Sequence, residues 1–181
     1  MKIIGGKFKG RNIEAPKDIR PVSVMVRKAC FDIFRGEVEG RNVLDLFAGS
    51  GSLGIEALSQ GACGSTFVDS SKRGLRVLQK NITFLGIDSK SEVHLKDSLS
   101  AVKDFFTYRK YFDIVFLDPP YSSQMLRKTL QALEEYDILT PSGYIVAFCY
   151  WKDDFFEDCG KFSLIVHKKY GQTLLLIYRK K

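Results

Sequence analysis

The sequence predicts an α/β fold with a mostly parallel sheet that is covered by helices on both faces and ends in an antiparallel hairpin. Three observations support this fold class. From residue 41 onward, apolar strand-like runs alternate with helix-like stretches, as in a doubly covered parallel sheet. Gly61 and Gly86 each follow a helix-like stretch at the position where glycine ends helices. After Gly160 the alternation stops, and two strand-like runs meet at Tyr170 and Gly171.

The elements follow in order from this pattern. Residues 1–40 are expected to form a basic N-terminal extension with a β-hairpin and a helix, and residues 41–181 the core. In the core, apolar runs predict five strands, and amphipathic stretches predict the helices between them. The expected strands are 42–48, 65–69, 91–97, 111–118 and 143–151, followed by the final hairpin, and the expected helices are 52–61, 70–86, 99–108 and 123–139.

Composition limits the class of protein. The chain has 181 residues, of which 45% are hydrophobic and 13% aromatic, which predicts one globular domain that folds alone. No apolar run approaches the roughly 20 residues that span a bilayer, and the N-terminus lacks a signal-peptide pattern, so we expect a cytoplasmic protein without membrane contact. Four cysteines without CxxC spacing indicate buried free thiols and no metal site. Nothing in the sequence demands more than a monomer.

The positive charge is concentrated at the two ends. The net charge is +7, and residues 1–30 and 160–181 each carry +6, so residues 31–159 carry −5. Basic ends predict contact with a polyanion, and an acidic body predicts a site for a neutral or cationic ligand. Lys7, Lys9 and Arg11 alternate with small and apolar residues, so on a strand they would share one face. The alternative is that solvated lysines only keep the chain soluble.

A glycine-rich segment, GSGSLG at residues 49–54, follows the first core strand. It matches GxGxxG, and Asp69 lies twenty positions after Gly49, as in dinucleotide-binding folds. Asp45, however, lies four residues before Gly49, where a carboxylate would repel a pyrophosphate and favour an ammonium group. S-adenosylmethionine carries an ammonium and a sulfonium and has no phosphate, so it fits this pattern better than NAD.

Four aspartates lie at or near the carboxyl ends of successive predicted strands. Because these ends share one edge of a parallel sheet, the aspartates should line one crevice. We expect Asp45 to serve the methionine end of the cofactor, Asp69 the ribose hydroxyls and Asp97 the adenine amino group. For any one of them, and for the third above all, the alternative is a helix N-cap. The four are Asp45, Asp69, Asp97 and Asp118.

The segment FLDPPYSS at residues 116–123 ends the fourth core strand with two prolines. Each proline restricts itself and the residue before it, so the corner is stiff. It can hold the Asp118 carboxylate and the Pro119 carbonyl as two fixed acceptors for the hydrogens of an exocyclic amino group. Tyr121 can stack on a planar base. The alternative is that Pro119 and Pro120 only end a strand.

These motifs carry a family resemblance. VLDLFAGSGSLGIEAL, FVD and DPPY, together with the opening MKIIGGKFKGRNIEAPKDIRP, VRKACFDIF and the closing KKYGQTLLLIYRKK, are similar to the bacterial 16S ribosomal RNA guanine-966 N2-methyltransferases along nearly the whole chain. The resemblance implies the Rossmann-like, seven-stranded class I methyltransferase fold and S-adenosylmethionine as methyl donor. It also implies a guanine of 16S ribosomal RNA as acceptor, within the small ribosomal subunit or an assembly intermediate.

The resemblance also assigns residues to roles. The implied catalytic residues are Asp118, Pro119, Pro120 and Tyr121. The implied cofactor contacts are Asp45, Phe47, Gly49, Ser50, Gly51, Asp69, Ser70, Asp97 and Ser98, and the implied RNA contacts are Lys7, Lys9, Arg11, Arg20, Ser23 and Arg27. The chain departs from the family pattern after Pro21, where Val22, Ser23 and Met25 replace two threonines and an arginine.

Two other classes of function stay open at this stage. One is a methyltransferase that acts on another amino group, such as adenine N6 of DNA or RNA or a protein glutamine. The other is an RNA-binding or assembly module, or an NAD-binding protein, without transferase activity.

Overall fold

The computed structural model describes residues 1–16, 22–120 and 124–181, and its centre is one eight-stranded sheet. The helices are α1 (Val24–Ile33), α2 (Ser52–Ser59), α3 (Lys72–Leu85), α4 (Ser98–Thr107) and α5 (Met125–Glu135), with a short 3₁₀ turn at Asp88–Lys90. The strands are β1 (Asn42–Asp45), β2 (Gly64–Asp69), β3 (Ser91–Leu95), β4 (Phe112–Leu117), β5 (Leu139–Tyr150), β6 (Asp158–Cys159), β7 (Phe162–Tyr170) and β8 (Thr173–Lys180).

The strand order across the sheet is β3-β2-β1-β4-β5-β8-β7-β6. Strands β1 to β5 run parallel, and β8 lies antiparallel between β5 and β7. Without the two-residue β6 these are seven strands that end in an antiparallel hairpin, so the predicted fold class is confirmed. The chain order reverses between β1 and β4, and such a switch point is where open α/β sheets bind ligands.

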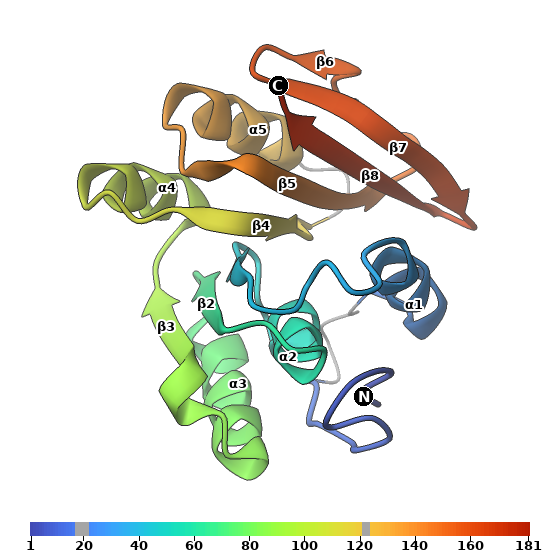
Figure 1. The fold of residues 1–181 in the computed structure, drawn as a ribbon, viewed down its shortest axis with the longest axis vertical. Coiled ribbons are helices and arrows are strands. Elements are labelled where there is room, and N and C mark those ends of the chain that lie inside the picture. Colours follow the sequence, from blue (N-terminus) through green and yellow to red (C-terminus); the bar gives the residue numbers. More distant parts are fainter. Residues whose placement is uncertain (17–21, 121–123) are drawn as a thin grey trace.

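Helices cover both faces of the sheet (Figure 1). Helices α1, α2 and α3 pack on one face and α4 and α5 on the other, which gives two hydrophobic cores separated by the sheet. In α3 the buried positions Leu75, Leu78, Ile82 and Leu85 recur every three or four residues, as one apolar stripe requires. The helix ends at Gly86 in the left-handed conformation, where the sequence predicted its end.

The segment between α5 and β5 differs from the prediction. The helix ends at Glu135 instead of near residue 139, and β5 begins at Leu139, four residues before the expected strand. Leu139 is buried and lies opposite Phe112 of β4, and the register then shifts before Ile114. A tertiary pairing with β4 therefore takes over residues whose local pattern continues the helix.

The N-terminal hairpin has a single β-bridge, between Lys2 and Asn12. Residues 5–10 form turns, so the predicted strand alternation of Lys7, Lys9 and Arg11 on one face is wrong. Small and apolar side chains in this segment instead anchor it: Ile3, Phe8 and Ile13 are buried in the core on the α2 side.

The described free cysteines differ in their exposure to solvent. Cys30 and Cys149 are buried, but Cys63 is exposed, against the expectation of buried thiols, and its Sγ donates to Asn42 Oδ1 at 3.1 Å. Within the described ranges, no three His, Cys, Asp or Glu side chains lie grouped to hold a metal ion. In the same ranges, no helix has the length and apolar character to cross a membrane.

Candidate active site

A cleft of about 650 Å³ opens at the carboxyl ends of β1, β2 and β4, at the switch point of the sheet. We call it the acidic cleft. It brings together the predicted cofactor contacts, apart from one glycine, and the described part of the predicted catalytic corner. Its lining is Asp45, Phe47, Ala48, Gly49, Ser50, Ser52, Leu53, Asp69, Ser70, Ser71, Asp97, Ser98, Asp118, Pro119, Pro120 and Met125.

Asp45 ends β1 and is buried, with 1% of its surface exposed. Its Oδ2 accepts a hydrogen bond from the backbone N–H of Gly54 at 3.1 Å, whereas its Oδ1 has no partner among the described residues. Burial raises the pKa of Asp45 to about 7, partly offset by the Gly54 N–H, and the charge on Asp69 raises it further. One oxygen therefore holds α2 in place, and the other is a buried acceptor at the lining of the cleft.

The glycine turn is held by Asp69, the last residue of β2. Its two carboxylate oxygens accept from the backbone N–H groups of Gly49 and Ser71, each at 2.7 Å. Each oxygen keeps a second lone pair, so Asp69 can still accept from ribose hydroxyls. Gly51, with φ of 88°, does not line the cleft, and a side chain there would meet Leu78 at 2.4 Å. The conformation of Gly51 serves the turn, and its contact with the cofactor stays a prediction.

Asp97 is both a helix cap and part of the cleft lining. It is the N-cap of α4, and its side chain accepts from the backbone N–H of Ser100 at 2.9 Å. The hydrogen bonds from Ser100 hold the pKa of Asp97 below its ordinary value. Asp97 is therefore a helix N-cap, as the alternative interpretation expected, and it also lines the cleft. The adjacent Ser98 is buried, and its Oγ has no partner among the described residues.

The predicted catalytic corner lies at the rim of the acidic cleft. Asp118 follows β4 and is partly exposed, Pro119 is buried and Pro120 is exposed. Although part of the residue is exposed, loss of water around its carboxyl group raises the pKa of Asp118 to about 8, with a further contribution from the charge on Asp45. Tyr121, the fourth predicted catalytic residue, lies outside the described residues.

The residues present fit a cationic nucleoside. The lining of the acidic cleft contains four aspartates and, among the described residues, no lysine or arginine. Asp45 Oδ1 and Ser98 Oγ are buried polar atoms that have no hydrogen-bond partner among the described residues. Phosphates would meet this concentration of carboxylates unfavourably, whereas an ammonium and a sulfonium would reduce the repulsion between them. The cleft thus favours S-adenosylmethionine over a dinucleotide.

Comparisons with known proteins agree with this geometry. A family model described as "Conserved hypothetical protein 95" matches residues 1–179. "Putative rRNA methyltransferase YlbH" of Bacillus subtilis is 33% identical over 183 residues, which covers 100% of both chains. "Ribosomal RNA small subunit methyltransferase D" of Buchnera aphidicola is 33% identical over 181 residues, 99% of this chain and 86% of the relative. The chain belongs to the small-subunit methyltransferase D family.

A solved structure shows the same architecture. "Putative methyltransferase yhhF from Escherichia coli" superimposes with a TM-score of 0.87 at 28% identity and covers 100% of this chain and 98% of that one. The eight-stranded sheet with its reversed final hairpin is therefore the class I methyltransferase fold, and the acidic cleft lies at the switch point of that fold.

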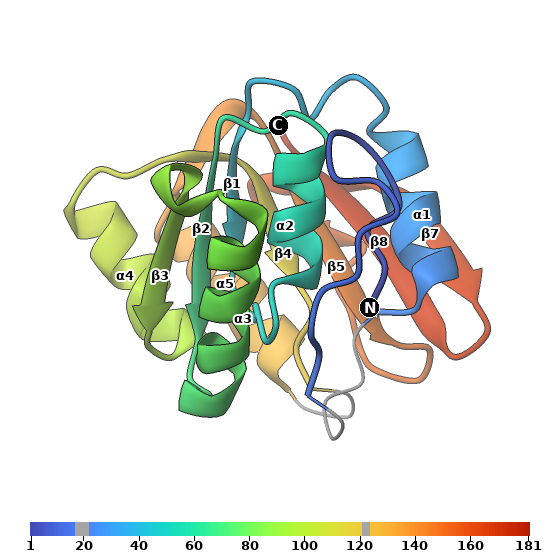
Figure 2. The same ribbon diagram turned by 90° about the horizontal axis from the view of Figure 1, so that it is seen from below.

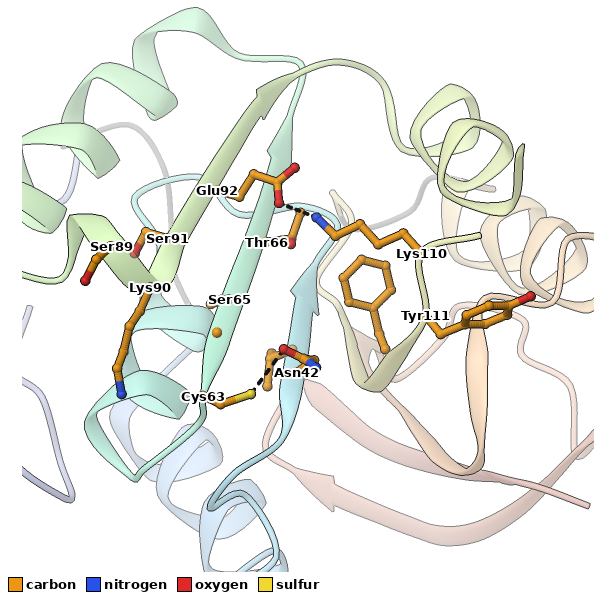
Figure 3. A pocket seen from close by; sticks show the side chains of 13 residues that line it. Asn42, Cys63, Ser65, Thr66, Ser89, Lys90, Ser91, Glu92, Lys110 and Tyr111 are labelled. Atoms are coloured by element: carbon orange, nitrogen blue, oxygen red, sulfur yellow. Dashed lines mark hydrogen bonds and ion pairs between the residues drawn. The ribbon is translucent and has the colours of Figure 1, made fainter. Parts of the chain in front are cut away.

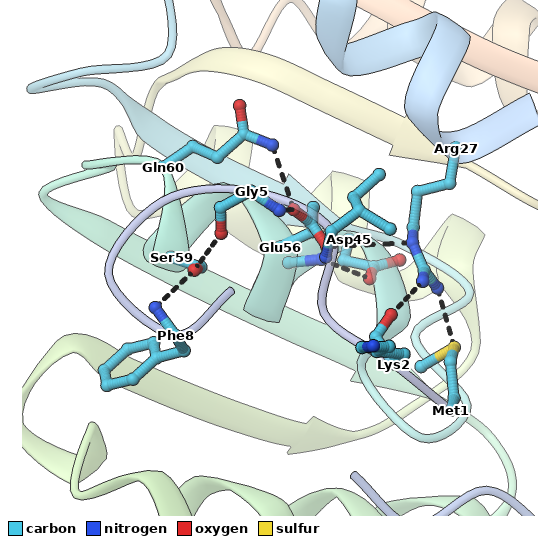
Figure 4. A network of polar contacts seen from close by, with 11 residues as sticks. Met1, Lys2, Gly5, Phe8, Arg27, Asp45, Glu56, Ser59 and Gln60 are labelled. Atoms are coloured by element: carbon cyan, nitrogen blue, oxygen red, sulfur yellow. Dashed lines mark hydrogen bonds and ion pairs between the residues drawn. The ribbon is translucent and has the colours of Figure 1, made fainter. Parts of the chain in front are cut away.

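Arg27 corrects one family-based assignment. Its side chain is only 1% exposed, and its Nε lies 3.7 Å from Oε2 of Glu56, which is equally buried (Figure 4). The guanidinium also donates to the backbone oxygen of Lys2, and Glu56 accepts from the N–H groups of Ile4 and Gly5 at 3.0 and 2.8 Å. The prediction that Arg27 contacts RNA phosphates is wrong. Its charge is used inside the protein, where it ties α1 and the N-terminal segment to α2.

The other predicted RNA contacts lie in different places. Lys7, Lys9 and Arg11 are exposed, but the backbone N–H of Lys7 donates to the oxygen of Ser59, in the last turn of α2 (Figure 2). An eight-residue helix is roughly 12 Å long. Because α2 starts at the acidic cleft, this loop lies at the opposite edge of the sheet.

Two further predicted contacts complete this set. Ser23 is the N-cap of α1, and its Oγ accepts from the backbone N–H of Val26 at 3.3 Å. Arg20 lies outside the described residues.

Asn81 is a buried residue that supports the glycine turn and that sequence reasoning missed. It is buried on α3, and its amide nitrogen donates to the backbone oxygens of Ser50 and Glu14, each at 3.0 Å, while its side-chain oxygen accepts from the N–H of Glu14. It thereby connects the glycine turn to the N-terminal segment. The available signal was a polar residue within the apolar stripe of α3, next to Ile82.

A second hollow, of about 340 Å³, lies at the amino ends of the parallel strands (Figure 3). Lys110 and Glu92 form an ion pair there, and the Cys63 thiol faces Asn42. None of the predicted site residues lines it. The acidic cleft alone therefore combines the cofactor and catalytic assignments.

Proposed function

We propose that this protein transfers a methyl group from S-adenosylmethionine to the exocyclic N2 of a guanine in small-subunit ribosomal RNA. Methyl transfer from S-adenosylmethionine is the activity of the fold and the family. The guanine N2 and the ribosomal RNA are the finer part that we propose. The name of the Buchnera relative, a small-subunit ribosomal RNA methyltransferase, supports the choice of RNA.

The observation that carries the proposal is the position of Asp118 and Pro119 at the rim of an acidic lining to which the described part of the chain contributes no lysine or arginine. In this arrangement Asp45 would hold the ammonium end of the cofactor, Asp69 its ribose hydroxyls, and Asp97 and Ser98 its adenine. S-adenosylmethionine supplies an electrophilic methyl group on a cationic sulfonium.

The protein must make the guanine amino nitrogen nucleophilic. Its lone pair is delocalised into the ring, so the nitrogen reacts only when its two hydrogens are held out of the plane of the base. The Asp118 carboxylate and the Pro119 carbonyl would accept these two hydrogens at a corner that the prolines stiffen. The carboxylate would also stabilise the positive charge that develops on the nitrogen. Tyr121 would stack on a base that is turned out of its RNA.

Mass spectrometry of nucleosides from small-subunit RNA tests the proposal. Cells that lack the gene should lose one N2-methylguanosine, and the wild-type gene should restore it. Loss of N6-methyladenosine with N2-methylguanosine intact would instead support an adenine methyltransferase. An unchanged nucleoside profile would refute a role in this RNA.

The role of Asp118 is tested by single-turnover methylation of small subunits that lack the modification, with the cofactor saturating. Asp118→Ala should bind S-adenosylmethionine through the remaining aspartates but react roughly 10² to 10³ times more slowly. A wild-type rate would mean that the proline corner only ends β4.

A further inference from the structure

A groove of about 650 Å³, distinct from the acidic cleft and from the hollow at the amino ends of the strands, lies between α5 and the loop that follows β5. It is continuous along the chain with the acidic cleft, because Gln124 lines the groove and the next residue, Met125, lines the cleft. We call it the α5 groove. Its lining is Gln124, Arg127, Lys128, Gln131, Tyr150, Lys152, Asp153 and Asp154.

The charged residues that line the α5 groove are mostly cations, whereas those that line the acidic cleft are aspartates. The α5 groove is lined by three cations, Arg127, Lys128 and Lys152, and all three are exposed. One of its two acids, Asp153, is engaged in a turn, where its Oδ2 accepts from the backbone N–H of Tyr150 at 3.0 Å. With Asp154 as its second acid, the groove carries a net charge of +1, and it lies directly beside a cleft lined by four aspartates.

An exposed tryptophan extends this basic surface. Trp151 is 41% exposed, and Nζ of Lys169 lies 3.9 Å from its ring centroid, with Nζ of Lys152 at 5.0 Å. The ring of Tyr150 lies 6.0 Å away. The backbone N–H of Trp151 donates to Gln172 at 3.0 Å, which fixes the loop to the β7–β8 turn. An aromatic ring among cations is the arrangement by which proteins bind single-stranded nucleic acid.

The position of this surface distinguishes it from the N-terminal cations. Lys7 and Arg11 belong to the loop beside the last turn of α2, at the amino edge of the sheet. The α5 groove lies at the carboxyl edge, where Asp118 is placed. The α5 groove therefore shares the edge of the sheet with Asp118, whereas the N-terminal loop lies at the opposite edge.

We propose that the α5 groove, with Trp151 and Lys169, binds the single-stranded RNA that flanks the target guanine. Arg127, Lys128 and Lys152 contact its phosphates, and Trp151 stacks on a base. This inference rests on the proposed function, because it assumes that the acceptor is RNA. A protein of the ribosomal subunit is the competing occupant, and the experiment separates the two.

The fluorescence of Trp151 reports on the groove directly, because the chain contains one tryptophan. Short single-stranded oligouridine should quench it, whereas S-adenosylmethionine and a duplex RNA of the same length should leave it nearly unchanged. Quenching should weaken as salt is raised. Absence of quenching at oligouridine concentrations that saturate binding would overturn the proposal.

Charge variants separate phosphate contact from general electrostatics. Lys128→Gln/Lys152→Gln should weaken the binding of labelled oligouridine several-fold and lower the slope of log affinity against log salt by about 1.4, since each phosphate contact of a single strand contributes about 0.7. The matched control, Lys90→Gln/Lys103→Gln, removes the same charge at exposed sites on other elements and should change the slope far less. Equal effects of the two pairs would overturn the proposal.

Variants of the ring separate stacking from charge. Trp151→Ala should weaken oligouridine binding roughly ten- to a hundredfold without changing the salt slope, and Trp151→Phe should restore most of the affinity. If the groove variants slow methylation of small subunits but leave oligouridine binding intact, the occupant is a protein and the proposal fails.

The two proposals fail in different ways. If cells without the gene lose N2-methylguanosine but the groove variants bind oligouridine as the wild type does, only the proposal for the α5 groove is refuted. An unchanged nucleoside profile sinks the proposed function, whatever the oligouridine results.

Discussion

Asp45 ends β1 and Asp118 follows the neighbouring parallel strand β4, and their carboxyl groups are close enough that the charge on Asp45 adds to the loss of water in raising the pKa of Asp118 to about 8. In the register of β1 and β4, Asp45 lies opposite Phe116, two residues before Asp118. The sheet thus gathers two acids that repel each other where a cation is to bind. From this relationship we expect cofactor binding to depend on pH.

The first prediction concerns proton release. A cation in the acidic cleft favours ionised carboxylates and lowers their pKa values, so S-adenosylmethionine should displace protons from Asp45 and Asp118 below pH 8. Its affinity should therefore rise between pH 6 and 7.5. Calorimetry in buffers with different ionisation enthalpies measures the protons released, and Asp118→Asn should reduce their number. Equal binding heats in all buffers would contradict this coupling.

The second prediction concerns stability. The pKa of Asp118 is higher in the folded protein than in the unfolded chain, so the folded state binds the proton more tightly and its stability falls as the pH rises from about 4 towards 8. Asp118→Asn removes this cost of ionisation. Without cofactor, the variant should melt a few degrees above the wild type at pH 8 and close to it at pH 4 to 5. A melting temperature lower than that of the wild type at pH 8 would show that the carboxylate stabilises the fold.

The third prediction concerns the buried pair of Arg27 and Glu56. Arg27→Met leaves the Glu56 carboxylate without its cation, which should destabilise the protein by roughly 3 to 5 kcal/mol. Lys28→Met, on the exposed face of the same helix, is the control and should have little effect. Urea unfolding measures both variants. If Arg27→Met were as stable as the control and lowered the salt slope of RNA binding, the guanidinium would act on RNA after all.

The fourth prediction concerns the close approach of α2 to β2. A side chain at Gly54 would lie 2.3 Å from Phe67 Cε1 and 2.5 Å from Ser65 Oγ, so Gly54→Ala must move the helix although alanine favours helices. We expect a loss of roughly 1 to 3 kcal/mol. The Asp45–Gly54 hydrogen bond should be disturbed, and S-adenosylmethionine affinity should fall. Gly64→Ala, whose nearest neighbour atom would lie at 3.4 Å, is the matched control. Equal stability of the two variants would show that α2 adjusts without cost.

Local pattern was sufficient for the alternation of strands and helices and for the edge at which the aspartates meet. Apolar runs mark β1, β2 and β4, and the carboxyl ends of parallel strands lie at one edge of a sheet. Asp45, Asp69 and Asp118 could therefore be predicted to lie close together. The same reasoning failed for Leu139, which local pattern assigns to a helix and which pairing with Phe112 places in β5.

The sequence by itself determined the order of the elements and the glycine turn, because each depends on residues close together in the chain. It also determined the acidic edge, because the carboxyl ends of parallel strands lie at one edge of the sheet. The tertiary structure decided what distant residues do to one another. Arg27 is a buried partner of Glu56, twenty-nine positions away, and not a phosphate contact. Trp151, which follows β5, meets Lys169 of β7 although β8 lies between these strands, and the two form a basic aromatic surface beside the acidic cleft. Burial and pair contacts of this kind depend on how the layers pack, and no local periodicity encodes them.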